Sequence, residues 1–159
     1  MTRIVAAFVV AMGSLAAGRS GSAQTTNFAC TGPADVCAFV RHFIATLNDH
    51  DWDGFRACLA DDVTVLFDRP GPPERQDGRN AVEAFFRRAF PVSGVTPTVT
   101  LSLLRPQDVL VQPAGDAAVV SFLLRNPDSV SRRTLVVRKG VTGWQVIHIH
   151  ASSMPVPAR

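Results

Sequence analysis

The apolar residues of this chain follow the period of a helix in the first half and the period of a strand in the second. Helical spacing begins after Pro33 and again after Asp51 and Asp77, two residues that can cap helices. The run VTVLF at residues 63–67 predicts a buried strand between the second and third helices. After Pro91 the runs TVTLSLL, DVLVQ, AAVVSFLLR, RRTLVVRK and WQVIHIHAS predict strands separated by Pro, Gly, Asn and Asp. This order predicts an α+β fold in which a curved antiparallel or mixed sheet covers three N-terminal helices.

Residues 1–23 have the composition of a secretory signal peptide. The positive start MTR is followed by an apolar run from Ile4 to Ala17 and by small residues that end at Ala23. The apolar run is too short to favour a membrane span, and an uncleaved N-terminal anchor is the alternative. We therefore expect an exported protein, periplasmic or secreted. Its expected parts are the signal peptide at 1–23, a linker at 24–33, one domain at 34–155 and a tail at 156–159.

The charge of the expected mature chain is nearly balanced. Of the 16 basic residues, Arg3 and Arg19 fall in the signal segment, which leaves 14 against 13 acidic residues. The arginines are interleaved with Asp and Glu without a long basic run, which argues against nucleic-acid binding. We expect no nucleic-acid partner and no stable membrane insertion after signal cleavage, and no cofactor is indicated.

Export would allow disulfide formation between two of the three cysteines, Cys30, Cys37 and Cys58. One bridge can be made in three ways, and the sequence alone does not choose between them. The pair Cys30 and Cys37 is the favoured candidate, because it would attach the N-terminal segment to the start of the first helix. Cys58 lies in an apolar helical pattern and is interpreted as core filler. The spacings contain no CxxC element, which argues against a zinc site.

Three stretches carry a resemblance that extends over about residues 34–155: FVRHFIATLNDHDWDGFRACLADDVTVLFD, GRNAVEAFF and the closing GWQVIHIHASSMP. Together they resemble the nuclear transport factor 2-like superfamily and, within it, the SnoaL-like branch. The closing stretch is also similar to the end of the calcium/calmodulin-dependent kinase association domain. The resemblance implies a cone in which a strongly bent sheet wraps around three helices. It also implies an apolar pocket at the open end and dimers packed through the outer sheet face.

The known catalytic residues of the superfamily are mostly missing from this chain. Its steroid isomerases stabilise an oxyanion with a tyrosine and a protonated acid, and the resemblance places Phe43 and Leu135 at those positions. The base aspartate falls near Phe67, one residue before Asp68. Without the two oxyanion donors, isomerase chemistry of that type is disfavoured. Asp68 could still act as an acid or base with help from Arg133 or a histidine, so whether the chain is an enzyme stays open.

The stretch WQVIHIHASS places His148 and His150 on one face of an extended strand. A metal site would need a third ligand from elsewhere, and we predict none because the other histidines and the glutamates lie outside the strand region. Ile147 and Ile149 would then lie on the opposite face, which we interpret as the core face. The two histidines would lie on the convex face and form a dimer contact.

The strand RRTLVVRK precedes this stretch, and its pairing affects which face of the last strand is the core face. If the two strands pair across the plain four-residue loop GVTG, Leu135 and Val137 share a face with the histidines. A bulge at Gly140 or Gly143 would instead place Leu135 and Val137 on the same face as Ile147 and Ile149. The sequence leaves both arrangements open.

We therefore expect an exported, dimeric SnoaL-like domain that binds a small apolar ligand or acts as an interaction module, without the known catalytic residues of the family. The alternative is an isomerase, cyclase or hydrolase that acts on a small hydrophobic substrate with Asp68 as acid or base. A third hypothesis is pure assembly, with the histidine face buried between two copies. The candidate pocket residues are Phe43, Leu47, Trp52, Phe67, Phe85, Phe122, Ile147 and Ile149.

Overall fold

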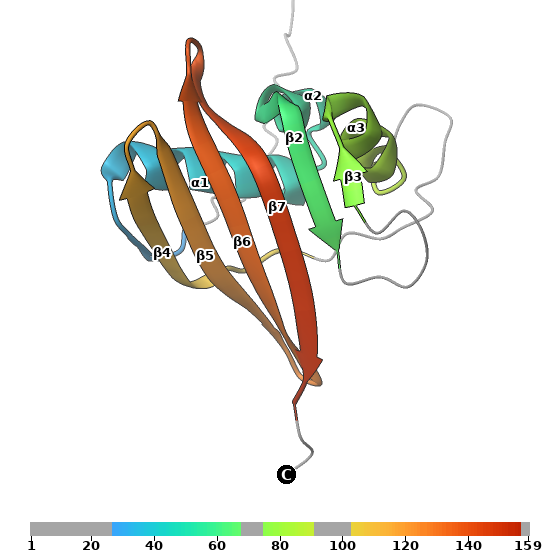
Figure 1. Cartoon of the computed structure of the whole chain (residues 1–159). Coiled ribbons are helices and arrows are strands. Elements are labelled where there is room, and N and C mark those ends of the chain that lie inside the picture. The colour runs from blue at the N-terminus through green and yellow to red at the C-terminus, as the bar shows by residue number, and fades with distance from the viewer. Residues whose placement is uncertain (1–26, 68–74, 91–102, 157–159) are drawn as a thin grey trace, which may run out of the picture.

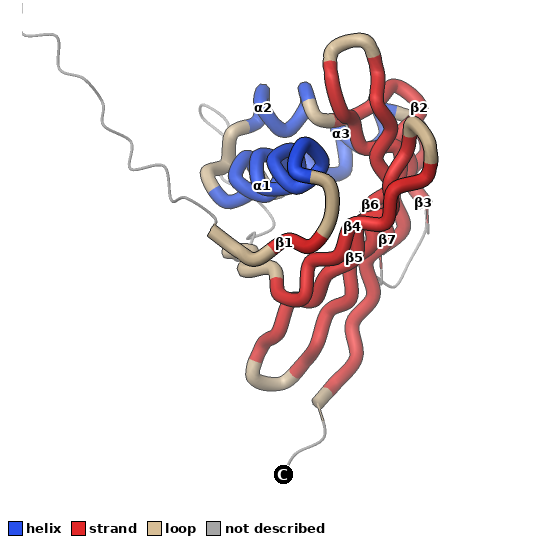
Figure 2. The backbone as a smooth tube through the Cα atoms, turned by 90° about the vertical axis from the view of Figure 1, so that its left-hand side faces the viewer, coloured by secondary structure: helices blue, strands red, loops and turns tan. Residues whose placement is uncertain are grey.

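The computed structural model describes residues 27–67, 75–90 and 103–156. A twisted, curved sheet forms one layer, and helix α1 crosses one of its faces (Figure 1, Figure 2). The helices are α1 (Ala34–Asn48), α2 (Trp52–Ala57) and α3 (Arg79–Arg87). The strands are β1 (Cys30–Thr31), β2 (Leu59–Phe67), β3 (Arg75–Asp77), β4 (Gln107–Ala114), β5 (Ala117–Asn126), β6 (Ser129–Gly140) and β7 (Gly143–Pro155). This architecture confirms the predicted α+β class.

The sheet is mixed, with the strand order β1-β4-β5-β6-β7-β2-β3. Strands β4 to β7 form consecutive antiparallel pairs. Strand β2 lies parallel to β7, and β1 lies parallel to β4. Because β2 comes between α2 and α3 in the chain, this pairing holds both short helices at the β7 side of the sheet (Figure 1).

The first two helices begin where the sequence predicts. Pro33 precedes α1, and a stripe of apolar side chains at helical spacing then faces the sheet. Asp51 caps α2, because its carboxylate accepts a hydrogen bond from the backbone N–H of Gly54 at 3.0 Å.

The expected cap of the third helix is wrong. Gly78, not Asp77, is the residue before α3. Its backbone φ is 81°, and no side chain caps the helix. Asp77 instead ends β3 and forms an ion pair with Arg75 at 2.7 Å. A glycine suits this position because other residues rarely adopt a positive φ.

Four of the five predicted C-terminal strands are present as β4 to β7, and the run VTVLF lies within β2. The exception is the run at 98–104. Leu103 and Leu104 lie outside any strand, and the remainder of that run lies outside the described residues. The expected signal peptide at 1–23 also lies outside them.

The disulfide joins Cys30 of β1 to Cys37 of α1 across a Cα–Cα distance of 5.9 Å. It therefore attaches the edge strand to the helix that crosses the sheet. Cys58 is a free, buried thiol directly after α2. Burial, with a smaller contribution from Asp51, raises the pKa of this thiol to about 11. It stays protonated at neutral pH, and a nucleophilic role is disfavoured.

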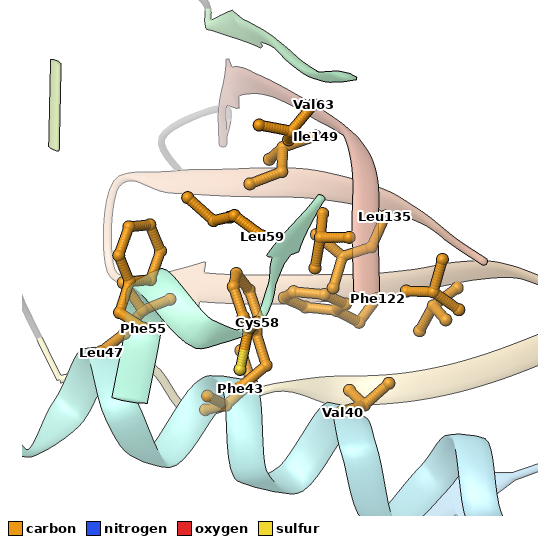
Figure 3. Packing of buried hydrophobic residues seen from close by; sticks show 14 of the residues in the cluster. Val40, Phe43, Leu47, Phe55, Cys58, Leu59, Val63, Phe122, Leu135 and Ile149 are labelled. Carbon is orange, nitrogen blue, oxygen red and sulfur yellow. The ribbon is translucent and has the colours of Figure 1, made fainter. Parts of the chain in front are cut away.

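The core lies between the helices and the inner face of the sheet. In Figure 3, Val40 and Phe43 of α1 point toward Phe122 and Leu135 of the sheet, and Phe55 lies above Leu47. Among the helices of the described ranges, none is long and apolar enough to cross a membrane.

Candidate functional site

A cavity of about 110 Å³ lies between α1, α3 and the inner face of the sheet. Seven buried residues form its floor: Phe43, Ile44, Leu47, Phe86, Phe122, Leu135 and Ile149. Four half-buried residues form its rim: Phe67, Leu104, Leu124 and Arg133. The cavity therefore opens toward solvent at the rim and is closed by apolar side chains at the floor.

The cavity depends on the pairing of three neighbouring strands. Phe122 of β5 is paired with Arg133 of β6, and Leu135 of β6 is paired with Ile149 of β7. Paired residues present their side chains on the same face of a sheet, so all four point to the helix side. The other walls come from α1, from α3, from the end of β2 and from the segment before β4.

A bulge in β7 decides which side of the last strand faces the cavity. Val136 is paired with His148, but the next residue, Val137, is paired with Val146, which leaves Ile147 without a partner on β6. Val146 and Ile149 are buried as a result, although they are three residues apart. The bulge lies at Ile147 and not in the loop, where the sequence suggested it.

Five of the expected pocket residues line the cavity: Phe43, Leu47, Phe67, Phe122 and Ile149. Ile147 does not, because the bulge removes it from the alternation of β7.

Trp52 and Phe85 also lie outside the cavity. Trp52 packs with its ring centroid 5.2 Å from that of Phe90, and Arg87 covers its ring. Phe85 stacks on Phe67 at 5.1 Å, behind the rim. Both aromatic residues share the apolar spacing of buried neighbours on their helices. Spacing alone therefore predicted them as pocket residues.

Sequence reasoning missed five lining residues: Ile44, Phe86, Leu104, Leu124 and Leu135. Phe86 and Leu135 belong to predicted helical and strand patterns, but the pattern does not show which apolar side chains border a void. Leu104 is held in place by Asn48 at the end of α1. The Asn48 amide donates to the Leu104 carbonyl at 3.0 Å, and its Oδ1 accepts from the Leu104 N–H at 2.7 Å.

Of the two expected catalytic residues, Arg133 lies at the rim of the cavity and is half-buried. Its Nη1 donates to the carbonyl of Arg132 at 3.2 Å and to that of Ser152 at 3.5 Å. Asp68 lies outside the described residues, one position after the rim residue Phe67.

The two histidines of β7 lie on the outer face of the sheet, away from the cavity. His148 is half-buried, and its Nδ1 shares a hydrogen bond with Thr64 Oγ1 at 2.7 Å. Burial lowers the pKa of His148, and the neighbouring His150 and Arg75 lower it further. His150 is exposed. Within the described ranges, no three His, Cys, Asp or Glu side chains gather in a way that could hold a metal ion.

Comparison with known proteins places this geometry in a family. The model of the SnoaL-like domain family matches residues 36–157. The comparison with curated proteins found no match.

Several solved structures share the fold. An NTF2-like protein of unknown function from Pseudomonas putida is 25% identical, with a TM-score of 0.59 over 74% of this chain and 82% of that one. A cystatin-like fold protein from Burkholderia xenovorans is 19% identical, with a TM-score of 0.61 over 78% and 92%. An NTF2-like protein from Cytophaga hutchinsonii is 16% identical, with a TM-score of 0.58 over 75% and 95%.

Proposed function

This chain belongs to the SnoaL-like domain family, and we propose that it binds a small, mostly apolar molecule in the cavity beneath α1. One observation carries this proposal: among the described residues, ten of the eleven side chains that line the cavity are apolar. An apolar cavity of about 150 Å³ stays dry and takes up a molecule such as benzene. The cavity of about 110 Å³ is smaller but opens at its rim, so it suits a short branched chain or a single ring that extends toward the rim.

The walls of the cavity favour a preformed site. Its floor residues come from α1, α3 and the central strands, which pack into one hydrophobic core. At the rim, the two hydrogen bonds between Asn48 and Leu104 hold the segment before β4 against the end of α1. A preformed cavity lowers the entropic cost of ligand binding.

Filling the cavity tests this proposal. Leu124 lies at the rim and is half-buried, so a larger side chain there would occupy the cavity without entering the closed floor. We expect Leu124→Trp to weaken the binding of toluene at least about tenfold, because the indole takes the volume that the ligand needs. The binding is measured by saturation-transfer NMR with toluene as the probe.

Leu123→Trp provides the matched control. Leu123 precedes Leu124 on β5, is also half-buried and points to the opposite face of the sheet. It should leave toluene binding unchanged. Equal binding of toluene by wild type and Leu124→Trp would contradict the proposal.

The alternative function is an isomerase, cyclase or hydrolase that acts on a small hydrophobic substrate with Asp68 as acid or base. The observation in its favour is that Arg133 lines the same cavity rim as Phe67, the residue before Asp68. Asp68→Asn separates the two functions once a ligand is known. An enzyme would keep the ligand but lose turnover, whereas a binding protein would show no turnover to lose.

The proposal includes a homodimer formed through the outer face of the sheet. One row of paired residues crosses this face in the order Leu66, His150, Thr134, Ser121 and Leu110. The two leucines at its ends are 36% and 42% exposed, so the row is apolar at both ends and polar between them. Such a mixed surface suits a self-complementary interface.

Light scattering tests the dimer. We expect wild type at the mass of a dimer and His148→Asp/His150→Asp at the mass of a monomer, because four carboxylates would then meet in the interface without partners. Val141→Asp, at the exposed tip of the β6–β7 hairpin, is the control and should remain dimeric. A dimer that persists in the double variant would rule out this face.

We also propose that the chain is exported with residues 1–23 as the signal peptide. The Cys30–Cys37 disulfide supports this proposal, since such bonds persist in oxidising compartments. Expression of the full chain in a bacterial host, followed by N-terminal sequencing of the periplasmic fraction, should show a mature chain that begins near Gln24. Recovery of the intact chain from the cytoplasm alone would contradict export.

A further inference from the structure

Two histidines project side by side from the outer face of β7. His148 and His150 follow the bulge and flank Ile149, whose side chain is buried on the opposite, inner face. The outer face is turned toward the viewer in Figure 1, and no helix of the described residues crosses β7 there. His150 is exposed and His148 is half-buried. Both imidazoles can therefore be reached from this side of the sheet.

A contact with Thr64 orients the ring of His148. Its Nδ1 atom shares a 2.7 Å hydrogen bond with the hydroxyl of Thr64, the residue of β2 with which His148 is paired. In a neutral imidazole one ring nitrogen donates and the other accepts. When Nδ1–H donates to Thr64, the lone pair of Nε2 is available to a ligand. Histidines that bind metals are oriented in this way, by a hydrogen bond from the nitrogen that does not bind the metal.

The spacing of the two histidines suits one metal ion. Residues two apart on a strand are separated by about 6.6 Å, so both imidazoles can bend toward an ion between them. Neutral imidazole is the commonest metal ligand in proteins and suits zinc, copper and nickel. A closed zinc site has four ligands. One copy of the chain supplies two of them on this face, and the site is incomplete without a second copy.

The charges near the histidines are compensated or exposed to water. Arg75 of β3 lies in the row of His150, two strands away, and forms an ion pair with Asp77 at 2.7 Å. Arg132 lies one row further along β6 and is exposed, so water screens its charge. The residues of β6 that pair with the two histidines are uncharged, namely Thr134 and Val136. A metal cation therefore meets no buried, uncompensated positive charge among these neighbours.

We infer that two copies of this chain share one transition-metal ion on the outer sheet face, bound by His148 and His150 from both copies. The inference rests on the proposed dimer, because a two-fold axis through this face brings the two imidazole pairs together. Facing sheets pack about 10 Å apart, so each imidazole has to reach about 5 Å to the midplane, which a histidine side chain can span. Four imidazoles then form a tetrahedral site of the kind that zinc occupies.

A dilution series followed by light scattering tests the inference on the wild-type chain, produced without a polyhistidine tag. Because only the dimer completes the site, zinc at about 100 times its dissociation constant should lower the dissociation constant of the dimer about 100-fold relative to EDTA. Mg²⁺ should have no effect, since it prefers oxygen ligands. Titration calorimetry should give one zinc ion per two chains.

Three variants locate the metal. His150→Gln removes two of the four ligands from the dimer and should abolish the effect of zinc. Thr64→Val removes the hydrogen bond that orients His148 and should weaken zinc binding about 10- to 100-fold. His42→Gln is the matched control, because His42 is an exposed histidine of α1, and it should keep the full effect of zinc.

The outcomes separate this inference from the proposed dimer. If wild type dimerises equally in zinc and in EDTA, or if His150→Gln keeps the effect of zinc, the shared metal site is overturned and the dimer stands. If wild type is a monomer under both conditions, the proposed dimer fails and the inference fails with it. Thermal unfolding shows that each variant is folded, and the exposed position of His150 carries the test if Thr64→Val is not.

Discussion

Phe55→Ala is expected to lower the free energy of unfolding by about 3–5 kcal/mol. Phe55 is 0% exposed and lies in the middle of an aromatic cluster. Its ring centroid is 4.7 Å from that of Phe86, 5.2 Å from that of Phe90 and 5.9 Å from that of Phe43. Removal of the ring would leave a void that these three neighbouring rings cannot fill, because they are held by α1, by α3 and by the turn that follows α3. Urea denaturation followed by circular dichroism measures the loss.

The control for this variant is Phe39→Ala. Phe39 is an aromatic residue of α1 that packs against the core but is only half-buried, so its truncation should cost clearly less. Because Phe43 and Phe86 line the cavity, Phe55→Ala should also weaken toluene binding in the folded fraction. Equal losses of stability for Phe55→Ala and Phe39→Ala would show that the cluster is not the centre of the core.

Cys30→Ser/Cys37→Ser is expected to lower the free energy of unfolding by about 2–3 kcal/mol. The bond closes a short loop, since the two cysteines are 7 residues apart in sequence. Its loss would free the unfolded chain and release β1, a strand of 2 residues that pairs with β4 at the sheet edge. Urea denaturation of the oxidised wild type and the double variant measures the difference.

A reducing agent provides the control for the disulfide. It should destabilise wild type by the same amount and leave the double variant unchanged. Cys58 is buried and its thiol has a raised pKa, so it should neither react nor replace either partner. A stability of wild type that is insensitive to reduction would show that the bond contributes nothing to the fold.

Local patterns in the sequence were sufficient for most of the fold. The apolar spacing after Pro33 and the capping residue Asp51 predict α1 and α2, because helix formation depends on residues within one or two turns. Alternation predicts β4 to β7 for the same reason. The cap of α3 was missed because Asp77 and Gly78 are both acceptable by type, and the backbone conformation at Gly78 decides between them.

The candidate site was less accessible to sequence reasoning. Five expected residues line the cavity, whereas Trp52, Phe85 and Ile147 do not. A helical stripe or an apolar run shows that a side chain is buried. It does not show whether the side chain borders other side chains or a void, because that depends on elements that are distant in the chain.

The sequence by itself determined the class of the fold, the helices, the C-terminal strands and the family. Only the tertiary structure decided which face of the last strand meets the helices. The alternation of β7 allows Ile147 and Ile149 to share the inner face, but the bulge at Ile147 keeps Ile149 inside with Leu135 and places His148 against Thr64 outside. One extra residue in a strand reverses the faces on either side of it, and its position depends on pairing with β6 and β2, which no local pattern encodes.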